Sequence, residues 1–325
     1  MKVAVTDYSF PDLSIEEGLL RGPDCDIVAW KERRTPRELT ELVADAGAVL
    51  TQFAPVNAEV IAAMGRARVI VRYGIGVDNV DLAAARARGI PVCNIPDYCI
   101  DEVADHTLAF ILGCTRQVLP NALLVREGQW GLATPLEGLR TLRDQVVGCV
   151  GFGRIGREVL SRLAPFKCRR LVFDPMVPPE AIRAAGCEPS TLDALLAESD
   201  IVTLHCPSTP ETRKLLNASS IARMRPGGIV VNLARGDLVD TAALAAALES
   251  GQLSAAAIDV CDPEPIPEDS PLRTLPNVIA ASHIASASPK AVRTLRETAA
   301  RIAGMALRGE RLPNIVNGVE PAGAP

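Results

Sequence analysis

The chain has 325 residues, which is too long for one ordinary domain and suits two. Its hydrophobic content of 48% provides a large core, which with only 3% aromatic residues consists of Ala, Val, Leu and Ile. The net charge of −5 is spread without a basic stripe, which argues against nucleic acid as a partner.

The first 98 residues alternate short strands with short helices, which predicts a parallel sheet covered by helices. Asn57 is expected to cap the third helix, and Gly89 to end the fourth. The predicted strands are 2–6, 26–29, 48–51, 69–71 and 91–94, and the predicted helices are 13–20, 36–44, 57–64 and 80–87.

A long apolar-periodic helix is predicted over 101–118, with Pro120 just beyond it. The segment 121–143 looks irregular, and either crosses to a partner subunit or runs over the surface. A second series of strands and helices then begins and ends in an extended tail at 312–319. Its strands are predicted at 146–150, 171–173, 201–204, 228–233, 256–260 and 278–281, and its helices at 155–163, 192–197, 218–224, 241–249 and 289–307.

The second series opens on a glycine motif, Gly151-x-Gly153-x-x-Gly156, between a strand and a helix. The first glycine permits a tight turn, the second lets a pyrophosphate approach the backbone, and the third lets the helix pack close to the strand. The helix N-terminus offers N–H groups to phosphate. Asp174 ends the next strand, where it can accept the ribose hydroxyls of NAD. The motif therefore predicts a dinucleotide site.

Nine scattered cysteines, without a C-x-x-C pair or a His-rich cluster, indicate reduced thiols and no metal site. No apolar run approaches the ~20 residues that a membrane span needs. The N-terminus also lacks the apolar core of a signal peptide. We therefore expect a cytoplasmic protein without a membrane partner.

Three histidines are candidates for acid–base chemistry. His106 lies within a helix and is expected to pack or to face solvent. His205 follows the strand 201–204, where it would line the cofactor side. His283 follows the strand 278–281 and is the best general acid, because imidazole titrates near neutrality.

Arg235 and Glu264 also follow predicted strands. Arginine forms a fork that fits a carboxylate, and a carboxylate held against an imidazole favours the imidazolium. Taken singly, Arg235, Glu264 and His283 are better explained as a surface salt bridge, a solvated acid and a satisfied histidine than as catalytic residues. Together they follow strands of one parallel sheet, at the edge where the cofactor must lie. A second candidate loop, 72–79, carries the backbone N–H groups of Ile75 and Gly76, which either hold a small anion or form an ordinary turn.

These motifs resemble the D-isomer-specific 2-hydroxyacid dehydrogenase family. The matching stretches are VGFGRIG (150–156), LHCPSTPET (204–212), NLARGDLVD (232–240), AAIDV (256–260) and RYGIGVDNVD (72–81). The resemblance implies an α/β protein in which a Rossmann-type doubly wound NAD-binding domain, 99–287, is inserted into a smaller flavodoxin-like substrate domain, 1–98 and 288–325. It also implies a homodimer built on the NAD-binding domain.

The resemblance assigns roles to further residues. Arg235, Glu264 and His283 are the expected catalytic trio, and Asp259 is expected to face the nicotinamide carboxamide. The residues expected at the substrate are Tyr73, Gly74, Ile75, Gly76 and Arg235. The residues expected at NAD are Thr107, Gly151, Gly153, Arg154, Ile155, Gly156, Asp174, His205, Cys206, Pro207, Thr212, Leu233, Ala234, Asp259 and His283.

The function expected from the residues and the resemblance is an NAD-dependent oxidoreductase that interconverts a small 2-oxo acid and its D-2-hydroxy acid. Cys93–Tyr98, Glu102–His106 and the tail resemble the branch of the C-terminal binding proteins, so an NAD(H)-sensing interaction protein is one alternative. A phosphoglycerate dehydrogenase-like enzyme is another, although Gln52-Phe53 offers no charge to a phosphate. A formate or phosphite dehydrogenase fits less well, since formate enzymes of this fold usually pair the histidine with glutamine.

Overall fold

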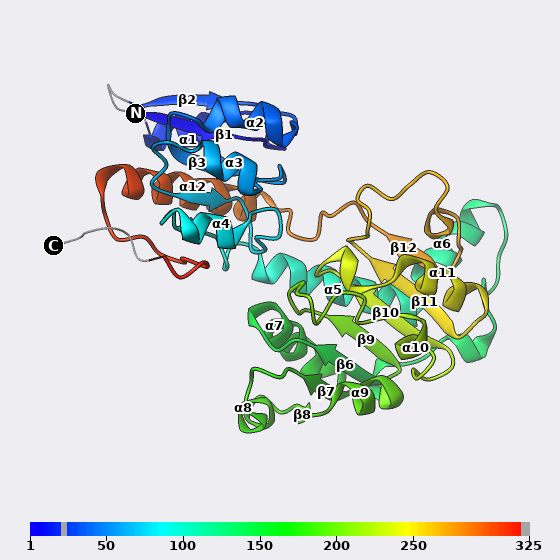
Figure 1. Cartoon of the computed structure of the whole chain (residues 1–325). Coiled ribbons are helices and arrows are strands. Elements are labelled where there is room, and N and C mark those ends of the chain that lie inside the picture. The colour runs from blue at the N-terminus through cyan, green and yellow to red at the C-terminus, as the bar shows by residue number, and fades with distance from the viewer. Residues whose placement is uncertain (21–24, 320–325) are drawn as a thin grey trace. The chain divides into compact units, whose positions relative to one another are not determined.

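The computed structural model describes residues 1–20 and 25–319, and the chain divides into two compact units (Figure 1). The first unit comprises Met1–Cys99 and Ser288–Pro325, and the second comprises Ile100–Ala287. All nine cysteines are free thiols.

The first unit is built on a five-stranded sheet in which every pair of neighbours is parallel. Its strand order, β2-β1-β3-β4-β5, is the flavodoxin-like order, so this part of the predicted fold is confirmed. The strands are β1 (Lys2–Val5), β2 (Asp26–Ala29), β3 (Ala46–Thr51), β4 (Ile70–Arg72) and β5 (Val92–Cys93).

Helices cover both faces of this sheet because its strands carry apolar residues on both sides. On one face, α1 (Ser14–Leu20) and α12 (Pro289–Arg308) pack over side chains such as Val3 and Leu50. On the other face lie α2 (Pro36–Val43), α3 (Ala58–Ala63) and α4 (Leu82–Ala87). The predicted cap is confirmed, since the Asn57 side chain accepts the N–H of Val60 at 3.1 Å.

The second unit contains a seven-stranded parallel sheet in the order β12-β11-β10-β9-β6-β7-β8. Counted from β6, this is the Rossmann order with one added strand, as predicted. The strand order reverses between β6 and β9, and ligands of such sheets bind at that switch point. The strands are β6 (Val146–Val150), β7 (Arg169–Phe173), β8 (Glu188–Pro189), β9 (Ile201–Leu204), β10 (Gly228–Asn232), β11 (Leu253–Ile258) and β12 (Val278–Ala280).

The helices of the second unit also lie on both faces of their sheet. On one face, α5 (Ile100–Thr115) and α7 (Arg154–Leu163) pack against each other and against the strands. The other face is covered by α9 (Leu192–Glu198), α10 (Ala218–Ile221) and α11 (Thr241–Glu249). The remaining short elements are α8 (Pro179–Ala184), η1 (Leu136–Gly138), η2 (Leu142–Asp144), η3 (Ala164–Phe166), η4 (Gly236–Leu238) and η5 (Pro271–Arg273).

Two predictions about the region after residue 100 need correction. The long helix ends at Thr115 instead of 118, because Gln117 adopts a left-handed backbone with φ of 50°. The segment expected to be irregular contains a helix, α6 (Val118–Arg126), in which no residue is buried. Among the described residues no single helix could cross a membrane by itself, although α5 and α6, bent by 65°, pass together by length and composition.

Candidate active site

The carboxyl ends of five neighbouring strands form one edge of the second sheet. The register pairs Val150 with Leu204, Leu204 with Asn232, Asn232 with Ile258, and Ile258 with Ala280. The predicted glycine turn, His205, Arg235, Glu264 and His283 each follow one of these ends. The fold therefore brings all five features to the same edge, as the sequence predicted.

The glycine turn has the geometry that a pyrophosphate requires. Gly151 has a φ of +98°, and a Cβ there would approach the backbone of His205 and Cys206 to 2.7 Å. A Cβ on Gly156 would collide with the carbonyl oxygen of Gly151. A Cβ on Gly153 would instead meet nothing within 4 Å, so the space beside this residue is open. Gly153 also begins α7 without a side-chain cap, which leaves the helix N-terminus to a ligand.

Asp174 follows β7 and closes the other side of this turn. Its Oδ2 accepts the N–H of Phe152 at 2.7 Å, and its Oδ1 accepts the N–H of Met176 at 2.9 Å. The carboxylate is thereby fixed beside the glycine turn while it remains partly exposed. Arg154 and Ile155 form the first turn of α7. These residues fit the binding of NAD, and their individual contacts with it stay predictions.

Arg235 lies in a loop that two other residues shape. The buried Asn232 side chain accepts the N–H of Ala234 at 3.1 Å and donates to the carbonyl of Arg235 at 2.8 Å. Gly236 packs so close to the next loop that a Cβ would collide with the carbonyl of Cys261. The Arg235 loop and the Glu264 loop are therefore in direct contact. Asn232 was not singled out from the sequence, although a polar residue that ends a buried strand was a possible signal.

Glu264 and His283 form the predicted pair. The Nδ1 of His283 lies 3.0 Å from Oε2 of Glu264, and the two side chains are 31% and 32% exposed. Burial opposes ionisation of Glu264, but the hydrogen bond and charge of His283, the Cys261 amide and Arg235 together hold its pKa below the usual 4.5. The ionised carboxylate only accepts, so Nδ1 is the donor of this bond. His283 has a left-handed backbone, with φ of 57°.

Asp259, which is 2% exposed, holds the turn that carries His283. Its two carboxylate oxygens accept the N–H groups of Ile284 at 2.8 Å and Ala285 at 2.9 Å. Its carbonyl oxygen accepts the N–H of His283 at 2.8 Å. These bonds explain the unusual backbone of His283. That Asp259 also contacts the nicotinamide carboxamide stays a prediction.

His205 and its neighbours line the switch point as expected. The Nε2 of His205 lies 2.9 Å from the hydroxyl of Thr203, and burial lowers the pKa of this histidine to about 4. Cys206 follows, and burial raises the pKa of its thiol to about 11. The hydroxyl of Thr212 donates to the carbonyl of Pro207 at 2.7 Å and so folds the loop.

Thr107 and Leu233, which were predicted at the cofactor, are also buried. Thr107 lies inside α5, where its hydroxyl donates to the carbonyl of Val103 at 2.7 Å, and it has no exposed surface. This burial gives its predicted contact with the cofactor no support. Leu233 is 8% exposed and continues from β10 toward the partly exposed Ala234.

The first unit has its own candidate site in the loop after β4. The N–H of Tyr73 donates to Thr51 at 2.8 Å, and the carbonyl of Gly74 accepts the N–H of Ile95 at 2.9 Å. The carbonyl of Ile75 accepts the Asn94 side chain at 2.6 Å. Hydrogen bonds therefore hold the backbone of this loop from Tyr73 to Ile75.

The loop after β3 corrects a sequence inference. Phe53 itself has no charge, but the guanidinium groups of Arg33 and Arg72 lie 4.7 and 5.6 Å from its ring centroid. The inference from Gln52-Phe53, which themselves offer no charge, was therefore incomplete, because two arginines from elsewhere in the first unit lie near this ring. Asp7, also missed, is 2% exposed and accepts the N–H groups of Gln52 at 3.0 Å and Phe53 at 2.7 Å. Within the described part of the chain, no cluster of His, Cys, Asp and Glu could hold a metal ion.

A Rossmann sheet with a glycine turn, an acid after its second strand and an acid–imidazole pair on the same edge defines a dinucleotide-dependent class of protein. Residues 108–285 match the family model described as D-isomer specific 2-hydroxyacid dehydrogenase, NAD binding domain. The chain belongs to the D-isomer specific 2-hydroxyacid dehydrogenase family, and its cofactor is NAD.

Curated relatives agree with this assignment. The chain is 38% identical over 291 residues to D-3-phosphoglycerate dehydrogenase of Mycobacterium tuberculosis, a match that covers 89% of this chain and 54% of the relative. The chain thus spans about half the length of these first relatives. It is 37% identical over 293 residues to glyoxylate reductase of Korarchaeum cryptofilum, with 89% of this chain and 88% of the relative covered. The resemblance to the C-terminal binding proteins stays a prediction.

Solved structures share the fold over the whole chain. D-lactate dehydrogenase from Aquifex aeolicus, complexed with NAD and lactic acid, has a TM-score of 0.87 at 26% identity, and each chain is fully covered (100%). A Granulicella formate dehydrogenase has a TM-score of 0.89 at 27% identity, again with 100% of both chains covered.

Proposed function

We propose that this chain is an NAD-dependent oxidoreductase that interconverts a small 2-oxo acid and its D-2-hydroxy acid. The observation that carries the proposal is the Glu264–His283 pair at 3.0 Å, on the sheet edge that also holds the glycine turn. Relatives named glyoxylate reductase, which match over nearly their whole length, support a small 2-oxo acid as the substrate. NAD supplies the hydride chemistry when it is bound.

The chain's own residues transfer the proton and bind the substrate. Glu264 accepts from Nδ1 of His283, so Nε2 is the nitrogen that gives a proton to the substrate carbonyl oxygen in reduction and takes it back in oxidation. Arg235 binds the substrate carboxylate through its guanidinium fork. In the first unit, considered by itself, the loop 74–76 is proposed to bind a carboxylate through the backbone N–H groups of Ile75 and Gly76.

A panel of 2-oxo acids tests this proposal. NADH oxidation is followed with glyoxylate, pyruvate, hydroxypyruvate and phosphohydroxypyruvate, and the reverse reaction with D- and L-lactate. We expect turnover of a small 2-oxo acid and preference for the D-isomer. Phosphohydroxypyruvate belongs in the panel because Arg33 and Arg72 surround Phe53. Tight NADH binding without any turnover would instead indicate a sensor.

Two variants connect the activity to the site. His283→Ala should lower kcat by roughly 10²–10⁴, the usual contribution of a positioned acid. Arg235→Lys keeps the charge but loses the fork, so it should raise KM and lower kcat together. Near-normal turnover by His283→Ala would refute the assignment.

We also propose that the chain forms a homodimer through the region around α6. This region exposes an unusual number of large apolar side chains, including Trp130, which is 93% exposed, and Leu136, which is 67% exposed. Many exposed apolar side chains within one short segment are typical of interaction sites. The set, called the apolar arm below, consists of Val118, Leu119, Leu123, Val125, Trp130, Leu132 and Leu136.

Light scattering coupled to size exclusion tests the dimer. Trp130→Ser combined with Leu136→Ser should convert the dimer to monomer. Met176→Ser is the matched control, because Met176 is 87% exposed in the same unit but lies outside the apolar arm. A monomeric wild-type protein would refute the proposal.

A further inference from the structure

A charged pair is buried between the two helices on one face of the first sheet. Glu16 on α1 has no exposed surface, and Arg296 on α12 is 5% exposed. Arg296 donates from Nη2 to Oε2 of Glu16 at 2.7 Å and from Nε to Oε1 at 3.0 Å. Buried ion pairs are often no more stabilising than apolar residues of the same volume. Stability alone therefore does not account for this pair.

The pair has a third partner in Tyr73. The Tyr73 hydroxyl donates to Oε1 of Glu16 at 3.1 Å, and the side chain is 1% exposed. Burial, followed by the charge of Glu16, raises the pKa of Tyr73 well above 10.0, so the hydroxyl stays a donor. The Tyr73 ring meets Phe10 edge-on with centroids 5.3 Å apart, and the Arg296 guanidinium lies 5.0 Å from the centre of Phe10.

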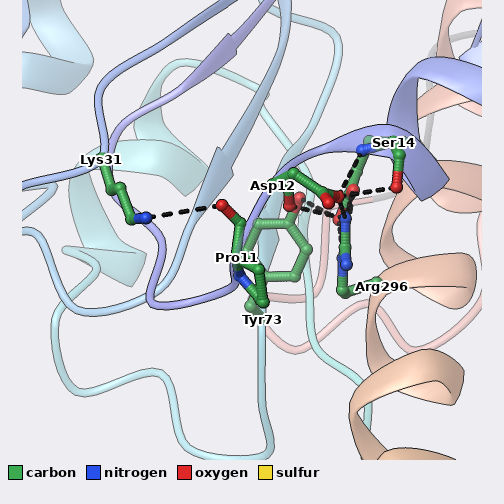
Figure 2. A network of polar contacts seen from close by, with 7 residues as sticks. Pro11, Asp12, Ser14, Lys31, Tyr73 and Arg296 are labelled. Carbon is green, nitrogen blue, oxygen red and sulfur yellow. Dashed lines mark hydrogen bonds and ion pairs between the residues drawn. The ribbon is translucent and has the colours of Figure 1, made fainter.

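The guanidinium of Arg296 is itself held in place. Its Nη2 also donates to the backbone carbonyl of Asp12 at 2.7 Å. The Asp12 carboxylate in turn accepts the N–H of Ser14 at 2.9 Å and its hydroxyl at 2.6 Å. Figure 2 shows Arg296 reaching from α12 toward Asp12, with Tyr73 beside it. Every member of the network therefore has a fixed direction, which an apolar contact would not impose.

Tyr73 is the residue at which this network meets the proposed substrate loop. It directly follows β4 and directly precedes Gly74, Ile75 and Gly76. The loop carbonyls are already bonded to Ile95 and to the Asn94 side chain. The hydrogen bond from the Tyr73 hydroxyl to Glu16 adds a further restraint on the residue that directly precedes the loop. A phenylalanine ring could pack in the same place, so the contribution of the Tyr73 hydroxyl is its hydrogen bond to Glu16.

We propose that Glu16 and Arg296 are positioning residues that fix the substrate-carboxylate loop 74–76 through the hydroxyl of Tyr73. The inference rests on the proposed function, because the carboxylate is what the loop is proposed to bind. Loss of the hydroxyl should widen the range of loop conformations. The N–H groups would then meet the carboxylate less often, which weakens substrate binding and so raises KM.

Tyr73→Phe is the decisive variant, because it removes one oxygen and leaves the ion pair and the ring packing in place. We expect KM for the best 2-oxo acid to rise about 3- to 10-fold, less than the full effect of losing a hydrogen bond to a charged group, because the hydroxyl acts on the substrate only through the loop. The affinity for NADH and the pH profile of the reduction should stay unchanged. Arg296→Lys keeps the charge and should show an intermediate KM.

Leu295→Val is the matched control for a merely structural effect. Leu295 precedes Arg296 on α12 and is 4% exposed in the same apolar core, without a polar link to Tyr73. It should lower the urea midpoint while leaving KM unchanged. A KM that rises equally in Leu295→Val and Tyr73→Phe would overturn the inference, since loosening of the core would then explain both.

Hydrogen exchange supplies a measurement that does not need activity. The amides of 74–76 should exchange about 3- to 10-fold faster in Tyr73→Phe than in the wild type, while those of β3 stay unchanged. Unchanged exchange at 74–76 overturns the inference whatever the kinetics. Faster exchange with an unchanged KM in an active enzyme overturns the link to substrate. If the wild type reduces no 2-oxo acid, the proposed function is wrong. The exchange of the amides of 74–76 then still tests whether the Tyr73 hydroxyl holds the loop in place.

Discussion

Replacing Glu264 by glutamine tests how the acid–imidazole pair works. Only a charged imidazolium can donate a proton during reduction, and the carboxylate of Glu264 stabilises that charge at 3.0 Å. The amide of Glu264→Gln keeps the size of the side chain and removes its charge. The imidazolium of His283 then loses the negative charge that lies beside it. We therefore expect the alkaline arm of the reductive pH profile to move toward acid.

The size of this shift follows from the exposure of the pair. Two unit charges about 4 Å apart attract by about 1 kcal/mol in water and by about 4 kcal/mol near a protein surface of lower dielectric. Since each side chain is about a third exposed, solvent screening keeps the interaction near about 1–2 kcal/mol. One pH unit corresponds to about 1.4 kcal/mol, so the arm should move by roughly one unit.

The assay is kcat/KM for the best 2-oxo acid as a function of pH, at saturating NADH. Glu264 has a pKa below 4.5, so its charge is present above that value and is lost as the pH falls through the lowered pKa. The kcat/KM values of the wild type and of Glu264→Gln should therefore become equal on the acid side of the pH profile. Glu268→Gln removes the same charge from an exposed position in the same loop and should leave the profile in place. An unshifted arm in Glu264→Gln would refute the pairing.

Two further predictions concern the cofactor and the fold. NADH should give a higher kcat/KM than NADPH, because a 2′-phosphate would face the carboxylate of Asp174. Asp174→Asn keeps an acceptor for the Phe152 amide and should reduce the ratio of the two kcat/KM values by about tenfold. Equal use of both cofactors by the wild type would contradict this prediction. Burial lowers the pKa of His205 from 6.5 to about 4, so between these two pH values His205 is protonated in the unfolded chain and neutral in the folded chain. The free energy of unfolding, measured with urea, should therefore fall by about 2 kcal/mol as the pH is lowered from neutrality to about 5. The fall should be smaller in His205→Gln, while the control variant His106→Gln should show the same fall as the wild type.

Most of the fold could be predicted because local signals agreed with the tertiary structure. Short apolar runs separated by capped helices gave the parallel strands, and β2, β6, β9 and α11 were predicted with the observed bounds. The helix α6 was missed because Pro120 was taken as a stop, whereas it lies in the first turn, where proline is tolerated. Its apolar residues also face solvent, so the usual alternation of polar and apolar residues was absent.

The candidate site was only partly predictable. Arg235, Glu264 and His283 could be singled out because each follows a strand of one parallel sheet. The contacts that orient them could not, since the Asp259 clamp depends on backbone positions that only the folded turn defines. The Glu16–Arg296 pair gave no local signal at all, because its partners lie 280 positions apart.

The placement of α12 has a consequence for the order in which the molecule can be made. Seven of its residues belong to the core cluster that covers one face of the first sheet, although that sheet is formed by the first 93 residues. A growing chain therefore carries a sheet with one face incompletely covered, and a Glu16 without its arginine, until synthesis has passed Arg308. The second unit is continuous and can fold while the first waits. Chaperone demand should accordingly concentrate on the amino-terminal segment, even though it is the earliest part to leave the ribosome.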